Sequence, residues 1–231
     1  MKRFYKNAGI QAVEGGFEIQ LDGRTIKTPL KTPLEVPTAA LAREIAREWE
    51  EQAETVQPET MPLTRLANTA LDRVAVRKDP VVEEIAAFGQ SDLLCYRAST
   101  PIELVERQVQ AWTPLLRWAE EHLGAALLVT EGIMHVDQPA DAVAALKSAV
   151  AALDPFRLAG LHTLTTISGS LVLGLAVVTG KLSADEAYVL SLIDETYQAE
   201  QWGSDEEAEQ RLRNREAEIR AAGVFLELLS V

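Results

Sequence analysis

The string Asp92-Leu-Leu-Cys-Tyr-Arg97 holds residue types that could build a nucleophilic site. Cys95 is the single cysteine of the chain, and a thiol beside a histidine base can act as a covalent nucleophile. No histidine lies near it in the sequence. We therefore expect Cys95 to be a small core residue beside two leucines, with Asp92 and Arg97 as outer polar contacts. An enzyme with an unrecognised site around Asp92 and Cys95 is kept as the alternative function.

The common catalytic and cofactor motifs are absent from the sequence. It has no Gly-rich phosphate loop, no H-E-x-x-H zinc motif, no paired-cysteine zinc pattern and no G-x-S-x-G elbow. His122, His135 and His162 are far apart in the sequence, which argues against a metal site. We therefore predict no catalytic residues, no cofactor and no metal.

Carboxylates gather around a tryptophan in segment 195–208, at the junction of two expected helices. Aromatic side chains anchor protein interfaces, and charge selects the partner. At 100° per residue, the apolar residues before the junction fall in one arc: Val189, Leu190, Ile193 and Tyr197. Glu200 lies inside that arc, Glu195 lies nearly opposite, and Trp202 follows the last turn before Gly203. A carboxylate on an apolar stripe either pairs with an internal arginine or protrudes to meet a partner, and both interpretations stay open.

The net charge of -13 is uneven along the chain. Residues 1–80 are neutral, whereas residues 183–231 hold 4 basic and 12 acidic side chains. A basic face for phosphate contacts is missing, so we expect no nucleic-acid binding. An acidic protein also repels anionic lipid surfaces. A single cysteine excludes an internal disulfide framework and fits a reducing compartment.

The segment 158–180 lacks charged residues and is about long enough to span a bilayer. Its histidine, threonines and serines would be poorly placed in lipid, so we expect a buried central helix with a break near Ser168-Gly169 and no stable membrane insertion. The N-terminus has no apolar signal region and no Arg/Ser-rich import leader. We expect the bacterial cytoplasm, although a mature protein of the mitochondrial matrix would look the same.

The first forty residues are predicted to form β structure. Gly15-Gly16 and Asp22-Gly23 are hairpin signals on either side of an alternating strand at 17–21. Flanking strands are expected at 10–14 and 24–28, and a short one at 34–36.

Helices are predicted to dominate after Pro37. In chain order we expect helices from a Thr38 cap to about 53, from Thr64 to about 76, from Asp79-Pro80, from a capping box at 100–103 to Gly124 with a kink at Pro114, at 138–153, after an Asp154-Pro155 cap, and from capping boxes at 183–186 and 204–207. Segment 57–62 is expected to be an extended loop, and 126–136 a late strand. The fold class is therefore α+β, with a small N-terminal β-meander or mixed domain over residues 1–80 and a larger all-helical domain over 81–231.

Eight short strings, in order from residue 3 to about 210, resemble one known family. They are Arg3-Phe-Tyr-Lys6, Gly16-Phe-Glu-Ile-Gln-Leu-Asp-Gly-Arg24, Lys27-Thr-Pro29, Glu48-Trp49, Thr60-Met-Pro-Leu-Thr64, Asp72-Arg-Val74, Asp92-Leu-Leu-Cys-Tyr-Arg97 and Gln198-Ala-Glu-Gln-Trp-Gly203. Their order and spacing are similar to those of the ATP synthase assembly chaperone that binds the α subunit of F1-ATPase, the ATP-twelve family.

The resemblance implies an assembly chaperone that is not an enzyme and uses no nucleotide or metal. Such a protein would hold the unassembled F1 α subunit, shield its apolar interface until the β subunit displaces it, and be monomeric when free. The family links its acidic helical region near the Trp-Gly pair to function, which implies partner-binding roles for Glu195, Glu200, Trp202 and Gly203. The family's mitochondrial members begin with an import leader, so a bacterial relative is implied. A generic acidic scaffold with another partner is a third hypothesis.

Overall fold

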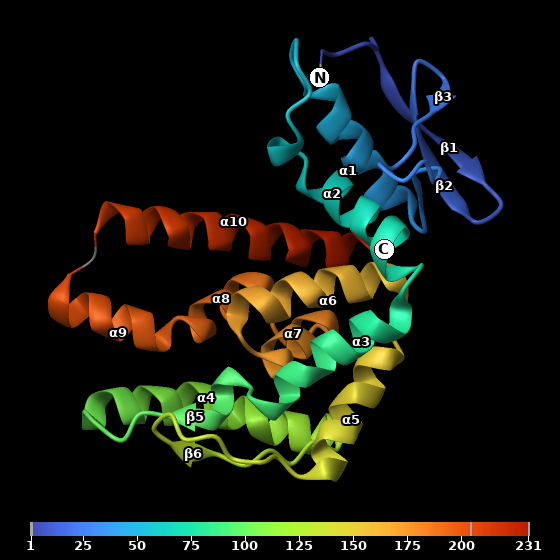
Figure 1. Cartoon of the computed structure of the whole chain (residues 1–231). Coiled ribbons are helices and arrows are strands. Elements are labelled where there is room, and N and C mark those ends of the chain that lie inside the picture. Colours follow the sequence, from blue (N-terminus) through green and yellow to red (C-terminus); the bar gives the residue numbers. More distant parts are fainter. Residues whose placement is uncertain (1, 204, 231) are drawn as a thin grey trace. The chain divides into compact units, whose positions relative to one another are not determined.

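The structure is a computed structural model that describes residues 2–203 and 205–230 of the chain. Strands lie mainly in the N-terminal region and helices make up most of the rest, which confirms the expected α+β fold (Figure 1). The chain divides into two compact units. Unit 1 holds Met1–Lys78, Asp154–Gly160 and Val224–Val231, and unit 2 holds Asp79–Leu153 and Leu161–Gly223.

Two short segments from late in the chain group with the N-terminal residues in unit 1. Phe156 and Phe225 stack with ring centroids 6.3 Å apart, and the Thr38 hydroxyl donates to the carbonyl of Leu228 at 2.6 Å. These contacts join residues that are far apart in the sequence, so no local sequence pattern predicts them. The domain boundary at residue 80 remains a proposal, and it assigns these two segments to the C-terminal domain instead of unit 1.

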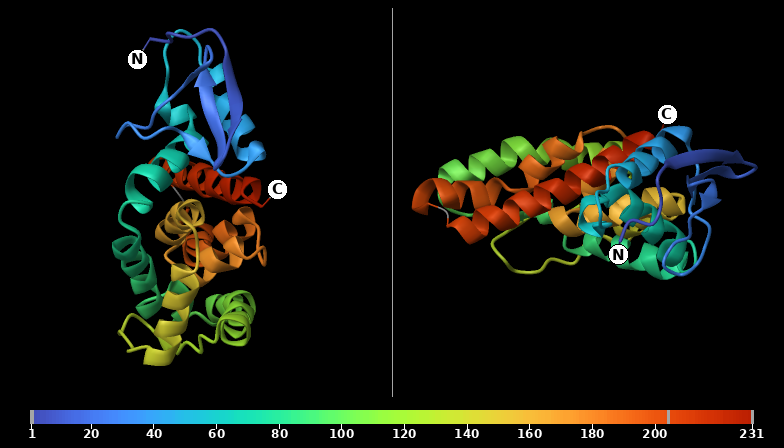
Figure 2. Two further views of the ribbon diagram at one scale, coloured as in Figure 1. Left: turned by 90° about the vertical axis from the view of Figure 1, so that its right-hand side faces the viewer. Right: turned by 90° about the horizontal axis from the view of Figure 1, so that it is seen from above.

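The sheet of unit 1 is built around one central strand. β2 (Gly16–Leu21) pairs antiparallel along its full length with β1 (Ala8–Val13), and the two strands lie side by side in the N-terminal part of the chain (Figure 2). β2 also pairs with β3 (Arg24–Thr25) and β4 (Glu35–Val36). A two-residue loop, Glu14-Gly15, joins β1 to β2. The expected strands are confirmed in place, but the third is shorter than 24–28. Beyond Thr25 the chain makes only an isolated bridge between Lys27 and Pro33.

Helix α1 (Ala39–Glu50) packs its buried Leu41 and Ile45 on one side and begins as predicted, because the Thr38 side chain accepts from the backbone N–H of Leu41. Segment 57–62 is not fully extended, since it contains a 3-10 turn, η1 (Pro58–Thr60).

The expected helix start at Thr64 is wrong. Helix α2 (Pro62–Thr69) begins two residues earlier and continues as a π-helical turn, η2 (Ala70–Val74). The Glu48 carboxylate of α1 accepts from the backbone N–H groups of Leu63 and Thr64 and from the Thr64 hydroxyl, at 2.6–2.8 Å. The acceptors that cap α2 therefore come from another helix rather than from its own first residues.

Asp22 ties the N-terminal segment to the turn after β2. Its carboxylate accepts from the backbone N–H groups of Asn7 at 2.9 Å and Lys6 at 3.1 Å, and these bonds hold its pKa below the ordinary value of 3.8. A depressed pKa in the folded state means that the stabilisation is present above the ordinary value and is lost as the pH falls through the folded value. We predict that Asp22→Asn lowers the midpoint of thermal unfolding at neutral pH, and that the difference from wild type shrinks in strong acid. A difference that stays constant over a pH series of melting curves would contradict this.

Unit 2 is mainly helical. Its elements are α3 (Lys78–Ala86), η3 (Ala87–Gln90), η4 (Leu93–Cys95), β5 (Tyr96–Arg97), α4 (Ile102–Leu123), β6 (Thr130–Glu131), α5 (Ala140–Ala151), α7 (Leu171–Val178), α8 (Ala184–Ser191) and α9 (Ile193–Trp202), with most of α6 (Pro155–Ser168) and α10 (Glu206–Leu228).

Two expectations for the middle of the chain are wrong. The Thr100 capping box does not form, because α4 begins after Pro101 and no side chain caps it. The late strand shrinks to the two residues of β6, which pair in parallel with β5. The stop at Gly124 is confirmed, since this residue ends α4 in the left-handed conformation at a φ of 72°.

The apolar segment forms two helices, as expected, with a left-handed Gly169 between them. The Asp154 carboxylate accepts from the backbone N–H groups of Phe156 and Arg157 and so caps α6. Every residue of α7 from Leu171 to Val177 is buried, which confirms a buried central helix. Among the residues that the structure describes, none of the helices combines the length and the apolar character needed to span a bilayer.

Candidate functional site

The acidic segment lies on α9 and the start of α10. The helical run before it is interrupted between α8 and α9. Helix α8 ends at Ser191, and Leu192 has φ and ψ angles of -106° and 14° that separate it from α9. The single apolar stripe predicted from Val189 to Tyr197 is therefore wrong. Val189 is 68% exposed on α8, whereas Tyr197 is buried on α9.

Glu200 has an arginine partner. Its carboxylate lies 2.8 Å from the Arg107 guanidinium of α4, and each side chain is about half exposed, at 45% and 46%. The same guanidinium lies over the Tyr197 ring, 5.2 Å from its centroid. This geometry matches the arginine-paired interpretation of Glu200, while solvent still reaches both charged groups.

Glu195 faces α10 rather than α4. Its carboxylate lies 4.0 Å from Arg215, whose guanidinium also donates to the carbonyl of Ile167 at 2.6 Å. Sequence reasoning missed Arg107 and Arg215 because both lie on other helices, and nothing local in the sequence connects them to the glutamates.

Trp202 is the last residue of α9 rather than the residue after it, and it is 79% exposed. Gly203 follows with a φ of 80°, a conformation that favours glycine, and its N–H donates to the carbonyl of Ala199 at 2.8 Å. The expected box at 204–207 includes Ser204, which lies outside the described residues. Asp205 accepts from the backbone N–H of Ala208 at 2.7 Å at the start of α10.

Three of the four candidate residues line one surface hollow of about 410 Å³ between α9 and α10. This α9–α10 hollow is formed by Glu195, Gln198, Ala199, Trp202, Gly203, Asp205, Ala208, Arg211, Leu212 and Arg215. Glu200 is not part of it and points to Arg107 instead. The hollow therefore combines an exposed indole with charged groups of both signs, which is a surface suited to a protein partner.

The alternative site around Cys95 is closed to solvent. Cys95, Asp92 and Arg97 are all buried, so the expectation that Asp92 and Arg97 are outer contacts is wrong. Burial and the nearby Asp92 charge raise the pKa of the Cys95 thiol to about 12, which disfavours the thiolate.

The three histidines have partners other than the thiol. His162 lies 3.2 Å from Glu84, His135 lies 3.3 Å from Tyr96, and His122 lies 3.2 Å from the Trp118 carbonyl near the end of α4. Over residues 2–203 and 205–230, histidine, cysteine and carboxylate side chains form no group of three that could hold a metal ion.

Comparison with known proteins identifies the family. Residues 2–120 match the family model described as ATP12 chaperone protein. The chain belongs to the ATP12 chaperone family. The crystal structure of Atp12 from Paracoccus denitrificans matches it with a TM-score of 0.95 and 46% identity, covering 99% of this chain and 98% of that one.

Two further relatives agree with this membership of the ATP12 family. A solved structure from Agrobacterium tumefaciens has a TM-score of 0.94 and 47% identity over 99% of this chain and 86% of that one. The mitochondrial protein atp12 of Schizosaccharomyces pombe is 28% identical over 219 residues, which are 90% of this chain and 75% of that protein. The matched family is one of chaperones.

Proposed function

We propose that this ATP12-family protein is an assembly chaperone for F1-ATPase. It binds the unassembled α subunit and shields its apolar interface until the β subunit displaces it. Membership of the chaperone family supports a role in F1-ATPase assembly. The observation that carries the proposed binding surface is Trp202, which stays 79% exposed on the rim of the α9–α10 hollow.

The chemistry of the hollow supports a temporary protein contact. A subunit that has not yet met its partner exposes apolar surface and tends to aggregate. An exposed indole can cover such a surface, and the surrounding charges limit the choice of partner. Glu195, Asp205 and Arg211 supply those charges around Trp202 and Gly203.

Gel filtration of mixed purified proteins tests the proposal. We expect the chain to co-migrate with unassembled F1 α subunit and to separate from the assembled α/β complex. Absence of co-migration with the unassembled α subunit would refute the proposal. A chain that stays on the assembled complex would refute displacement by β.

Variants of the Glu200–Arg107 ion pair distinguish a structural role of Glu200 from a direct contact of Glu200 with the client. We predict that Glu200→Lys costs at most about 1 kcal/mol of stability, because exposed ion pairs contribute about 0.2–1 kcal/mol. It should nevertheless weaken α-subunit binding, since it reverses an exposed charge two residues before Trp202.

The charge-swapped double variant, Arg107→Glu with Glu200→Arg, is the matched control. It should recover the melting temperature and leave client binding weak. If the swap restores both properties, Glu200 acts only through its pair with Arg107.

The chaperone proposal and the enzyme hypothesis make opposite predictions for the variant Cys95→Ser. A buried thiol with a raised pKa is a packing group, so we expect Cys95→Ser to lower stability modestly and leave α-subunit binding unchanged. Melting curves and the gel-filtration assay on the same variant measure both effects. Loss of function with the fold intact would favour a catalytic thiol.

We also infer that the free chain is monomeric and works in the bacterial cytoplasm, or in the mitochondrial matrix for a mature organellar form. Solved bacterial relatives and a mitochondrial relative support these settings. Sedimentation equilibrium of the free chain measures its oligomeric state. With a net charge of -13, we expect neither nucleic acid nor anionic membrane as a partner.

A further inference from the structure

Unit 1 carries a hollow of its own. It has a volume of about 500 Å³, and aromatic side chains of Phe4, Tyr5 and Trp49 form much of its wall, with Leu21 and Ile26 beside them. A volume of this order is within the range of sites that hold small ligands or inserted side chains. We name it the Trp49 hollow.

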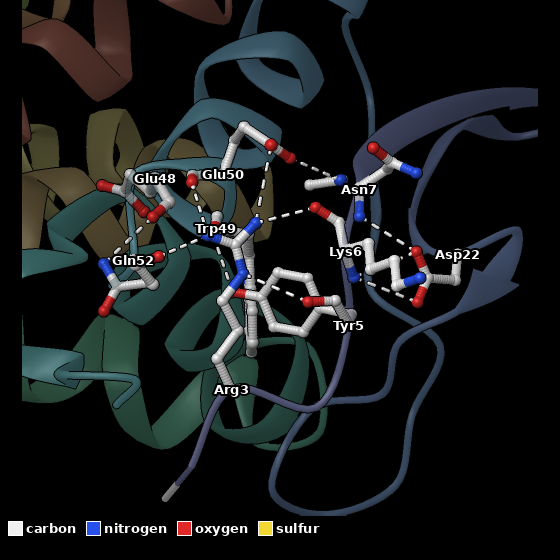
Figure 3. Close-up of polar contacts among 10 residues, drawn as sticks. Arg3, Tyr5, Lys6, Asn7, Asp22, Glu48, Trp49, Glu50 and Gln52 are labelled. Carbon is white, nitrogen blue, oxygen red and sulfur yellow. Dashed lines mark hydrogen bonds and ion pairs between the residues drawn. The ribbon is translucent and has the colours of Figure 1, made fainter. Parts of the chain in front are cut away.

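The aromatic wall is built from a chain of ring contacts. The Phe4 and Tyr5 ring centroids lie 5.3 Å apart and those of Tyr5 and Trp49 lie 5.8 Å apart, both in edge geometry. Phe4 stays 66% exposed. Figure 3 shows Tyr5 and Trp49 side by side, and the Tyr5 hydroxyl donates to the Trp49 carbonyl at 2.6 Å.

One polar group in this wall lacks a partner. The Trp49 indole N–H is buried and donates to no acceptor among the described residues, so a donor is left over next to the aromatic rings. An unmade hydrogen bond at a buried donor costs about 1–3 kcal/mol.

The rim carries two cations without partners. Arg24 and Lys27 are exposed, and neither side chain makes an ion pair or hydrogen bond with any part of the chain that the structure describes. Arg3, which lies over the Tyr5 ring, is in contrast held by the Glu50 carboxylate and by backbone carbonyls of Tyr5 and Gln52.

Asp22 is the one carboxylate in the lining, and its oxygens accept from backbone N–H groups. The uncommitted charge on the rim is therefore positive, in a protein whose net charge is -13.

We propose that the Trp49 hollow is a second client-binding site, which takes an apolar side chain of the client flanked by carboxylates. This inference rests on the proposed function. The aromatic wall receives the apolar side chain, and Arg24 and Lys27 attract the flanking carboxylates.

A second copy of this chain is the rival occupant. Trp202 is exposed and has acidic neighbours in Glu200 and Asp205, so it carries the same combination of groups. Sedimentation equilibrium distinguishes the two occupants. A wild-type dimer that is lost in the rim variants would assign the hollow to self-association and overturn the proposal.

The test compares matched variants of the full chain. Arg24→Glu with Lys27→Glu reverses the rim charges, and Arg43→Glu with Arg77→Glu makes the same change at exposed positions of unit 1 outside the hollow. Phe4→Ala shortens the wall, and Leu30→Ala removes an equally exposed apolar side chain elsewhere. Dissociation constants are measured with fluorescently labelled, unassembled F1 α subunit.

We expect the rim variant to bind roughly tenfold more weakly, and Phe4→Ala roughly fivefold more weakly, while both controls stay within about twofold of wild type. Overlapping synthetic peptides of the α subunit supply an independent readout. Wild type should select peptides with an aromatic or aliphatic side chain next to Asp or Glu, and the rim variant should lose that selection.

The outcomes separate this inference from the proposed function. If wild type binds the α subunit and both charge variants bind equally well, the hollow is not a client site although the chaperone function stands. If wild type does not bind the α subunit, the proposed function fails. If wild type selects peptides without a preference for Asp or Glu beside the apolar side chain, the inference is overturned whatever the result with the whole α subunit.

Discussion

Asp92→Ala is expected to lower the free energy of unfolding of unit 2 by about 3–5 kcal/mol. Each buried donor that loses its acceptor costs about 1–3 kcal/mol, and Asp92 is the acceptor for several donors. The Asp92 carboxylate is fully buried and accepts from three donors. These are the Ser170 hydroxyl at 2.7 Å and the backbone N–H groups of Leu94 and Val172, each at 3.0 Å. The substitution leaves all three without this acceptor at the start of the central helix α7.

The measurement has to report on unit 2 itself, since a chain with two compact units need not unfold in one step. Hydrogen exchange of the α7 amides gives a local free energy of opening. Asp137→Ala is the matched control, because this carboxylate is fully exposed in the same unit. Ser170→Ala removes one donor and should have a smaller effect than Asp92→Ala. Unchanged α7 protection in Asp92→Ala would show that the buried carboxylate does not hold α7.

The parts of the fold that sequence predicted are those that depend on neighbouring residues. Thr38 caps α1, Asp154 caps α6, and Ser183 forms a reciprocal capping box with Glu186. Gly124 ends α4 as a left-handed residue. Each signal lies within a few residues of the structure that it specifies, so no knowledge of the tertiary contacts was needed.

Two of the failures have a different cause, because each depends on a distant residue. Thr64 looks like a helix start until Glu48 of another helix supplies the capping acceptors. Asp92 looks like an outer contact until Ser170 and Val172 enclose it. Periodicity and capping rules describe one segment at a time and cannot include such partners.

The candidate site shows the same division. The exposed position of Trp202 before a glycine could be recognised in the sequence, because a helix was expected to end there. The roles of Glu195 and Glu200 could not, since their partners Arg215 and Arg107 lie on two other helices. The two glutamates consequently belong to different surroundings, and only Glu195 lines the α9–α10 hollow with Trp202.

Trp202→Ala is expected to weaken binding of the unassembled α subunit by about 2 kcal/mol or more, roughly thirtyfold, because aromatic anchors dominate the energy of protein interfaces. Its stability should stay near that of wild type, since an indole that is 79% exposed contributes little to the core. Trp202→Phe should keep part of the binding because it keeps an aromatic ring. Titration of labelled α subunit measures the affinity, and melting curves check the fold.

Val189→Ala is the matched control for this loss of apolar surface. Val189 is 68% exposed on α8 and does not line the α9–α10 hollow, so its removal should leave the affinity unchanged. Equal losses in both variants would indicate a diffuse apolar contact without an anchor at the end of α9. Full binding by Trp202→Ala would place the client elsewhere on the chain. If Trp202→Ala loses affinity for the α subunit, Val189→Ala does not, and Glu200→Lys loses less than Trp202→Ala, the anchor lies on the rim that α9 and α10 form together.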